Sequence, residues 1–429
     1  MFGKSSALIS IWLTLLMGGL LMATNTDACA DYPFHEDPNV LVVTRGDEVV
    51  NRLPCERIAL DGGGRWHNDH IRGQVGQTSD GTIYAQVGGA YGAYWVVGEG
   101  LNVMFASDDE GRTWESWNID LPEKRIIGAF TVLNDDSFLA AATGPGDTSI
   151  RYYRSEDRGH TWVQISELTC APFQNMYLDG NLLQLADGTI LSVAHYAVPP
   201  PAGADFSQGL GVEYVLRSTD GGKTWQGGPD PALWGPIIEA KLTVAPVGPQ
   251  SRVPGLGGTF PGCYETGLAE LSDGRVAAVL RFSGPAYPWH KDYVEAWGGA
   301  APDNVGRIFR QVMLSFSPDG GRTWAQMRPF VDAEGKPVIV QQETNGQMVE
   351  TPDGRLVLIH QRRFGPYQLI GRVSENRGQT WLHDEYRLSA GFGYSGNLVL
   401  DDGTIITVTG KSIGGNHSAQ VIRWRLPNQ

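Results

Sequence analysis

The sequence has few of the features that mark a disulfide scaffold, a metalloprotein or a nucleic-acid-binding protein. It has only 4 cysteines in 429 residues, and no Cys and His spacing matches a zinc site. It has no basic run, and its formal net charge of −14 disfavours nucleic acids and anionic membrane surfaces as partners. Long helical periods are scarce. We therefore expect no metal, no cofactor and no nucleic-acid partner.

A long apolar run is present only near the N-terminus, where residues 1–30 have the pattern of a signal peptide. Lys4 precedes an apolar run from Ala7 to Ala23, and Ala28-Cys29-Ala30 offers a small-residue cleavage site. The run is shorter than the ~20 residues that span a bilayer, so we expect no membrane span. Acylation of Cys29 in a lipoprotein is the weaker alternative. We expect a secreted or periplasmic monomer, with residues 31–429 as one domain.

Cleavage after Ala30 leaves Cys55, Cys170 and Cys263. An odd number allows at most one disulfide. Glycine, in contrast, is abundant, at 56 residues, nearly twice the usual ~7%. Together with 13 tryptophans, this composition favours many short strands joined by tight turns.

One phrase, Ser-x-Asp-x-Gly-x-Thr-Trp, recurs five times. In each copy the Asp side chain is expected to cap its own backbone, Gly to supply a positive φ, and Trp to pack behind the turn. The copies begin at Ser107, Ser155, Ser218, Ser317 and Ser374, and the last has Asn376 in the Asp position. Five copies in one chain indicate a repeat architecture.

A second phrase, Asp-Gly between two apolar runs, alternates with the first and is a strong hairpin signal. Its copies are at Asp80, Asp187, Asp273, Asp353 and Asp402, with a degenerate copy at Asp135-Asp136. Six hairpins and five boxes predict an all-β fold, a six-bladed β-propeller with four-stranded antiparallel blades. The last blade lacks a strand, and we expect the N-terminal run Asn39–Val43 to join Ala419–Leu426 there and close the ring. The surplus residues, Gln226–Gly262 and Ser283–Val305, are predicted to be loops on one rim.

At this point the chain resembles the sialidase (neuraminidase) superfamily, in which this repeat is known as the Asp box or BNR repeat. The resemblance covers essentially the whole mature chain. Asp boxes also occur in proteins that are not sialidases, so function must come from residues just ahead of the hairpins. Tyr264-Glu265 to Arg281 resembles the family segment that joins a pocket glutamate to a pocket arginine, and Phe392-Gly393-Tyr394-Ser395 resembles the segment with the nucleophilic tyrosine.

The resemblance implies that Tyr394 is the nucleophile and that Glu265 is the base that takes its proton. The substrate carries a carboxylate on its anomeric carbon, which would repel a carboxylate nucleophile but not a neutral tyrosine. A free tyrosine has a pKa of ~10, so it needs an adjacent base at neutral pH. Each residue alone would more often be a packed strand tyrosine or a rim carboxylate.

The family holds the substrate carboxylate with three arginines, whose planar groups bind it bidentately. Arg281 matches one of them, and Arg72 lies near the expected place of the first, although the usual Arg-Ile-Pro is absent. Arg362 or Arg363 is the candidate for the third. Arg307 and Arg310 are fallback candidates.

The general acid is a second departure from the family, which uses an aspartate after the first inner strand. Glu99 is the nearest carboxylate in register, and Asp69, between His67 and His70, is the rival. A glutamate or a histidine-rich loop there points to a different sugar. His67 and His70 are expected to contact substrate or to be hydrogen-bonded loop residues, and His360 adds a polar group in the fifth inner region.

Three functions stay open. The first is a secreted sialidase-type hydrolase acting on an acidic glycan. The second is a propeller enzyme for another acidic glycan, such as a uronate lyase in which His67 or His70 and a tyrosine transfer protons. The third is a non-catalytic glycan-binding propeller. A Tyr–Glu contact would favour the hydrolase, whereas pocket aromatics without it would favour binding alone.

Overall fold

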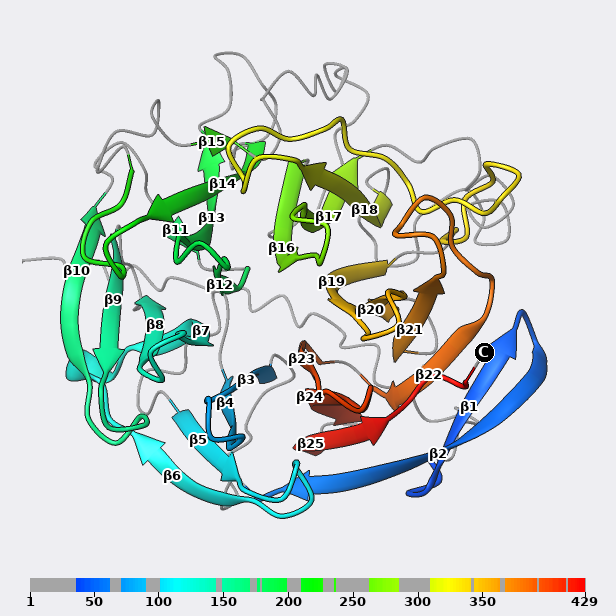
Figure 1. Ribbon diagram of the computed structural model, residues 1–429, viewed down its shortest axis with the longest axis horizontal. Coiled ribbons are helices and arrows are strands. Elements are labelled where there is room, and N and C mark those ends of the chain that lie inside the picture. The colour runs from blue at the N-terminus through cyan, green and yellow to red at the C-terminus, as the bar shows by residue number, and fades with distance from the viewer. Residues whose placement is uncertain are drawn as a thin grey trace, which may run out of the picture.

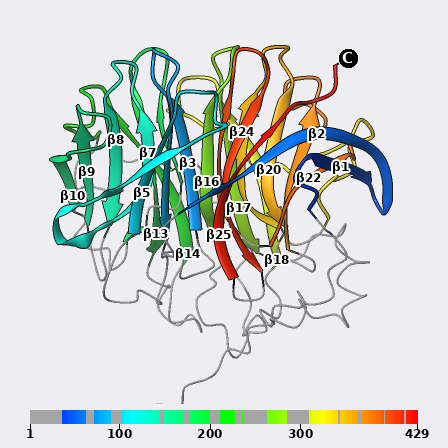
Figure 2. The same cartoon turned by 90° about the horizontal axis from the view of Figure 1, so that it is seen from below.

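The computed structural model describes residues 36–61, 71–89, 101–143, 149–169, 176–177, 180–198, 210–226, 235–236, 262–284, 309–340, 343–362, 367–391, 393–413 and 416–428. Within these ranges the regular structure is β-strand, apart from one 3₁₀ turn at Pro122–Lys124. No helix in the described part of the chain is long and apolar enough to cross a membrane. The sheets stand in a ring around a central axis (Figure 1), and a view turned by 90° shows the strands running along that axis (Figure 2).

Two of the sheets are simple four-stranded antiparallel units, as predicted. The first consists of β3 (Ile71–Gln77), β4 (Ile83–Gly89), β5 (Leu101–Ser107) and β6 (Glu115–Ile119). The second consists of β7 (Ile126–Val132), β8 (Phe138–Thr143), β9 (Ser149–Ser155) and β10 (Val163–Thr169). In both sheets the strands follow one another in chain order from the axis outward (Figure 1).

The third sheet joins two consecutive groups of strands. The earlier group is β11 (Met176–Tyr177), β12 (Leu182–Gln184), β13 (Ile190–Val198), β14 (Leu210–Ser218) and β15 (Gly235–Pro236). The later group is β16 (Gly262–Glu270), β17 (Val276–Gly284) and β18 (Phe309–Ser317). A single parallel pair, Gly211 with Gly262, connects them.

The fourth sheet has nine strands and contains both ends of the described chain. Its order is β19 (Glu343–Glu350), β20 (Leu356–Arg362), β21 (Gln368–Ser374), β22 (Glu385–Ala390), β1 (Val40–Arg45), β2 (Glu48–Leu60), β25 (Asn416–Trp424), β24 (Ile405–Ile413) and β23 (Ser395–Val399). The fold is thus a β-propeller of antiparallel blades, and the count of six blades stays a prediction.

The strand that closes the ring differs from the predicted one. The predicted run Asn39–Val43 falls in β1, which pairs with β22 at the outside of the preceding group. The strand beside β25 is instead the second half of β2, Cys55–Leu60. Because β2 has 13 residues, its first half pairs with β1 and its second half with β25. Its first half is exposed, so β2 does not have the burial pattern of an ordinary inner strand.

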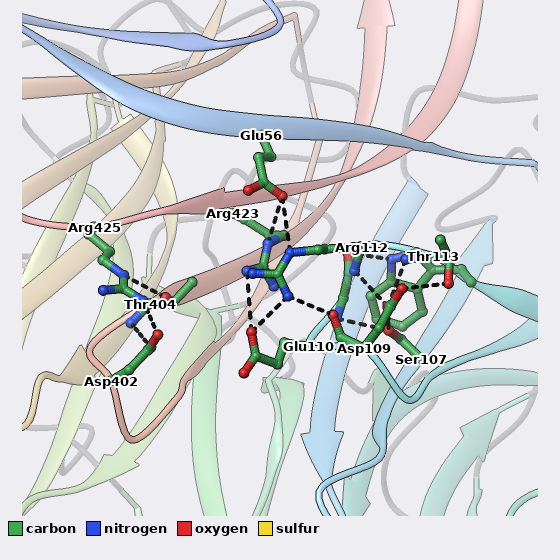
Figure 3. Close-up of polar contacts among 12 residues, drawn as sticks. Glu56, Ser107, Asp109, Glu110, Arg112, Thr113, Asp402, Thr404, Arg423 and Arg425 are labelled. Carbon is green, nitrogen blue, oxygen red and sulfur yellow. Dashed lines mark hydrogen bonds and ion pairs between the residues drawn. The ribbon is translucent and has the colours of Figure 1, made fainter.

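Ion pairs add to the closure where β2, β25 and the first Asp box meet (Figure 3). Arg423 on β25 is 5% exposed, and its Nε lies 3.0 Å from Glu56 on β2. Arg112 of the box lies 2.8 Å from Glu110 and 3.9 Å from Glu56. These contacts join residues from the two ends of the chain to the first sheet.

The core lies between neighbouring sheets, so strands inside the ring are apolar on both faces. On β17, Val276, Ala278 and Leu280 belong to a buried cluster shared with β13 and β14. Ala277 and Val279, which point to the other face, belong to a cluster shared with β20. This explains why β17, which directly follows the Asp273-Gly274 hairpin, begins with a continuous apolar run.

The Asp boxes form the predicted turn. In the first copy Ser107 Oγ donates to Asp109 Oδ1 (2.8 Å), and Thr113 donates its N–H and hydroxyl to the same carboxylate (2.8 and 2.7 Å). Left-handed backbone occurs at two consecutive residues, Glu110 (φ 59°) and Gly111 (φ 86°), and not at the glycine alone.

The fifth box keeps this turn with asparagine. Asn376 Oδ1 accepts from the Thr380 N–H (2.8 Å), and Asn376 Nδ2 donates to Thr380 Oγ1 (2.8 Å). The side-chain hydrogen bond therefore runs in the opposite direction to that of the aspartate boxes. The degenerate hairpin adapts similarly, because Asp136 takes the positive φ (63°) that glycine has in the other hairpins.

Candidate active site

Two neighbouring inner strands, β16 and β19, each contain a β-bulge at the end away from the Asp-Gly hairpin. The register of β16 with β17 shifts between Tyr264 and Gly267, and that of β19 with β20 shifts between Thr344 and Gln347. Such a bulge re-aims a side chain. Each bulge holds a non-glycine residue in left-handed backbone, Glu265 (φ 51°) in β16 and Asn345 (φ 58°) in β19. Positions of this kind are uncommon and concentrate at functional sites.

Glu265, Tyr394 and Arg281 meet in one buried group. Tyr394 Oη donates to Glu265 Oε1 at 2.8 Å, and Arg281 Nη1 donates to the same oxygen at 2.7 Å. The three residues are 5%, 8% and 9% exposed, respectively. The contact joins β16 and β17 to the segment just ahead of β23, so it forms only when the ring is closed.

The backbone around Tyr394 is held from both sides. Gln361, fully buried on β20, donates through Nε2 to the Gly391 carbonyl (3.1 Å) and accepts from the Gly393 N–H through Oε1 (3.2 Å). A Cβ on Gly393 would lie 1.9 Å from the Gly410 carbonyl oxygen, so only glycine fits there. One amide side chain thus fixes the turn that precedes Tyr394.

A second buried polar group lies on β19, β20, β21 and β22. Arg362 donates to Glu343 Oε1 (3.3 Å from Nε) and to Glu385 Oε1 (2.7 Å from Nη2), and Arg372 donates to Glu385 as well (2.6 Å). His360 Nδ1 lies 2.8 Å from Glu343 Oε2. Burial alone would raise the pKa of Glu343, but His360 and Arg362 hold that pKa well below its usual range.

This arrangement argues against one predicted arginine. The guanidinium of Arg362 is bound by two buried carboxylates, which keep its pKa above the usual value against the effect of burial. It balances internal charge, and we do not assign it to a substrate carboxylate. Its position on β20 points to the face shared with the preceding group, whereas Gln361 points to the face shared with the segment of Tyr394.

Most of the other predicted site residues lie outside the part of the chain that the structure describes. Arg72 lies on β3, but its side chain is outside the described part. Arg310 lies on β18, opposite Ser283 of β17. His67, Asp69, His70, Glu99, Arg363 and Arg307 fall outside the described residues, as does the expected signal peptide 1–30. Cys55 is buried with a free thiol.

The sequence prediction missed two residues near this group, Asn345 and Gln361. Aligning the hairpins at Asp273 and Asp353 places Asn345 opposite Glu265, so a blade-to-blade comparison would have found the first. Nothing in the sequence marks the second. Among the described residues no three His, Cys, Asp or Glu side chains come together as a metal site requires, and the absence of a metal stays a prediction.

A cavity of about 780 Å³ lies among the inner strands. Its lining includes Gln74, Gln347, Glu350 and Asn397, and the hairpin residue Asp353. The lining extends from Ser395, which directly follows Tyr394, to the Asp-Gly hairpin at Asp353. Glu265, Arg281 and Tyr394 are not among its lining residues.

Comparisons with known proteins agree with the repeats and the fold. Residues 153–165 match the BNR-Asp box repeat and residues 216–226 match the BNR/Asp-box repeat. No curated protein sequence is significantly similar to the chain. The chain is a BNR-repeat β-propeller. Its fold is similar to that of solved sialidases and of an arabinanase.

Three solved structures illustrate the likeness. A Dyadobacter fermentans protein of unknown function has a TM-score of 0.57 and 17% identity, covering 86% of this chain and 98% of that one. The Penicillium chrysogenum α-L-arabinanase, solved with arabinobiose, has a TM-score of 0.54 and 15% identity, covering 90% and 98%. A Hadza microbial sialidase has a TM-score of 0.53 and 16% identity, covering 87% and 71%. The chain spans 58% of the longer Trypanosoma rangeli sialidase. At these identities the likeness shows the fold alone.

Proposed function

We propose that this protein is a glycoside hydrolase of the sialidase type, which releases a terminal acidic sugar with retention of configuration. One observation carries the proposal: Tyr394 Oη lies 2.8 Å from Glu265 Oε1 in a buried group. A tyrosine becomes a useful nucleophile at neutral pH only when a base is in hydrogen-bond reach. The fold, shared with sialidases and an arabinanase, supports a glycosidase in general.

The first step forms a bond between Tyr394 Oη and the anomeric carbon while the bond from that carbon to the leaving oxygen breaks. The phenol proton passes to Glu265, and the leaving oxygen takes a proton from a general acid, for which Glu99 and Asp69 are the candidates. In the second step a water molecule gives a proton to the deprotonated general acid, and the water oxygen bonds to the anomeric carbon. The tyrosyl bond breaks, and Glu265 returns the proton to Tyr394.

Arg281 supports this chemistry through its direct contact with Glu265. An adjacent cation stabilises the ionised form of a carboxylate, and the ionised Glu265 is the form that accepts a proton. With its fork-shaped guanidinium, Arg281 is also a candidate for the substrate carboxylate, together with Arg72 and Arg363. The Tyr394–Glu265 contact supports hydrolysis over a purely binding role. We include export in the proposal, because residues 1–30 have the pattern of a signal peptide.

The test is the initial rate on a fluorogenic sialic-acid glycoside, for the wild type and for Tyr394→Phe. Activity that is lost in the variant would support both the class and the nucleophile. Tyr386→Phe is the matched control, because Tyr386 is a buried tyrosine (6% exposed) on the outer strand β22. No release by well-folded wild type would overturn the proposal and direct the work to uronic-acid polysaccharides, with unsaturated products followed by absorbance.

A further inference from the structure

The side chain of Asn345 is buried, although its amide makes no hydrogen bond to the described residues. It is 5% exposed, and within the described residues neither Oδ1 nor Nδ2 has a hydrogen-bond partner. Burying an amide without partners is unfavourable, and native structures rarely leave one so. The backbone of Asn345 is also left-handed (φ 58°). Asparagine tolerates that conformation better than most residues, but tolerance does not account for the unsatisfied amide.

The position of Asn345 in its strand is equivalent to that of Glu265. It occupies the same place in the bulge of β19 that Glu265 occupies in the bulge of β16. The two bulges pack directly on each other, since a Cβ on Gly267 would lie 2.4 Å from the Gly346 carbonyl oxygen. Around the axis β19 lies between β16 and β23 (Figure 1). Tyr394, just ahead of β23, therefore reaches Glu265 across the strand that carries Asn345.

We propose that Asn345 binds an uncharged polar group of the bound sugar, a hydroxyl or an acetamido group. A carboxamide has both a donor and an acceptor and no charge, and these sugar groups have the same pairing capacity. In this proposal the arginines, and not Asn345, bind the substrate carboxylate. The inference rests on the proposed function and extends it, because it assigns a residue that fixes which sugar fits beside Tyr394 and Glu265.

The experiment compares Asn345→Gly and Asn345→Asp with the wild type on the fluorogenic sialoside. Glycine favours positive φ, so the thermal midpoint of Asn345→Gly should stay the same or rise. Its KM should increase roughly 3- to 10-fold, the loss of one neutral hydrogen bond, with kcat nearly unchanged. Asn345→Asp should raise KM further, because its charge repels an acidic sugar. Arg377→Gly is the control, since Arg377 is also left-handed (φ 57°) but belongs to an Asp box.

The same variants are tested for binding of free N-acetylneuraminic acid by saturation-transfer NMR. An active wild type with an unchanged KM and unchanged binding in Asn345→Gly would overturn the inference alone and would indicate that water satisfies the amide. An inactive wild type would overturn the hydrolase proposal. In that case weaker binding by Asn345→Gly than by wild type would still support Asn345 as a sugar ligand. Equal binding, or none, would overturn it.

Discussion

Replacing Glu265 by glutamine keeps the shape of the side chain and removes its charge, which tests directly whether this residue is the base. The carboxylate oxygen Oε1 receives both the Tyr394 hydroxyl (2.8 Å) and Arg281 (2.7 Å). A glutamine oxygen can still accept these hydrogen bonds, but it cannot take the phenol proton. Because general base catalysis contributes roughly 10²- to 10⁴-fold, we expect kcat for Glu265→Gln to fall by about that factor.

The stability cost of the same substitution should be modest enough to leave a folded enzyme. Removing one partner of a buried ion pair altogether costs about 3–5 kcal/mol. Glutamine retains the acceptor, so the loss is closer to the difference between charged and neutral hydrogen bonds, about 1–2 kcal/mol. With an unfolding entropy of roughly 2.1 cal/mol/K per residue, a chain of this length should lose about 1–3 °C in Tm.

The assay is the initial rate on the sialoside together with the thermal midpoint, with Glu270→Gln as the control on the same strand. Glu270 lies at the hairpin end of β16, where it accepts from the Ala186 N–H (2.8 Å), so its variant should keep full activity. The base assignment would be refuted if Glu265→Gln, folded with a near-normal midpoint, kept more than a small fraction of the wild-type rate.

Three further outcomes are expected. Gln361→Met removes three backbone hydrogen bonds of a fully buried side chain, and kcat should fall roughly 10-fold or more because positioning is lost; an unchanged kcat would contradict this. Asn376→Asp should raise the free energy of unfolding by about 1 kcal/mol at pH 7, since charge-assisted hydrogen bonds replace neutral ones, and urea titration should show no gain near pH 2. The Thr113 N–H, with neighbouring donors, holds the pKa of Asp109 at about 2. The stability that this box contributes should therefore be complete above about pH 4, and an acid titration followed by circular dichroism should show its loss as the pH falls toward 2.

Much of the architecture is encoded locally. Each Asp box closes within eight residues through side chains that bond their own backbone, as Asp109 does with Thr113. The alternation of boxes with Asp-Gly hairpins was therefore enough to predict an all-β propeller. The expected partnership of Tyr394 and Glu265 came from the resemblance of two segments to a known family, and the two side chains do meet.

Other features depend on contacts between distant parts of the chain. Which N-terminal strand closes the ring was settled by the pairing of Cys55–Leu60 with β25, a register between the two ends of the sequence. The partners of Arg362 follow from which face of β20 it occupies, and Gln361, one residue earlier, faces the other way. The unsatisfied amide of Asn345 becomes visible only when two bulged strands pack side by side. The sequence by itself determined the turns and the repeat, because their hydrogen bonds are local; the tertiary structure decided the site, because its side chains come from different strands and meet only when the ring is closed.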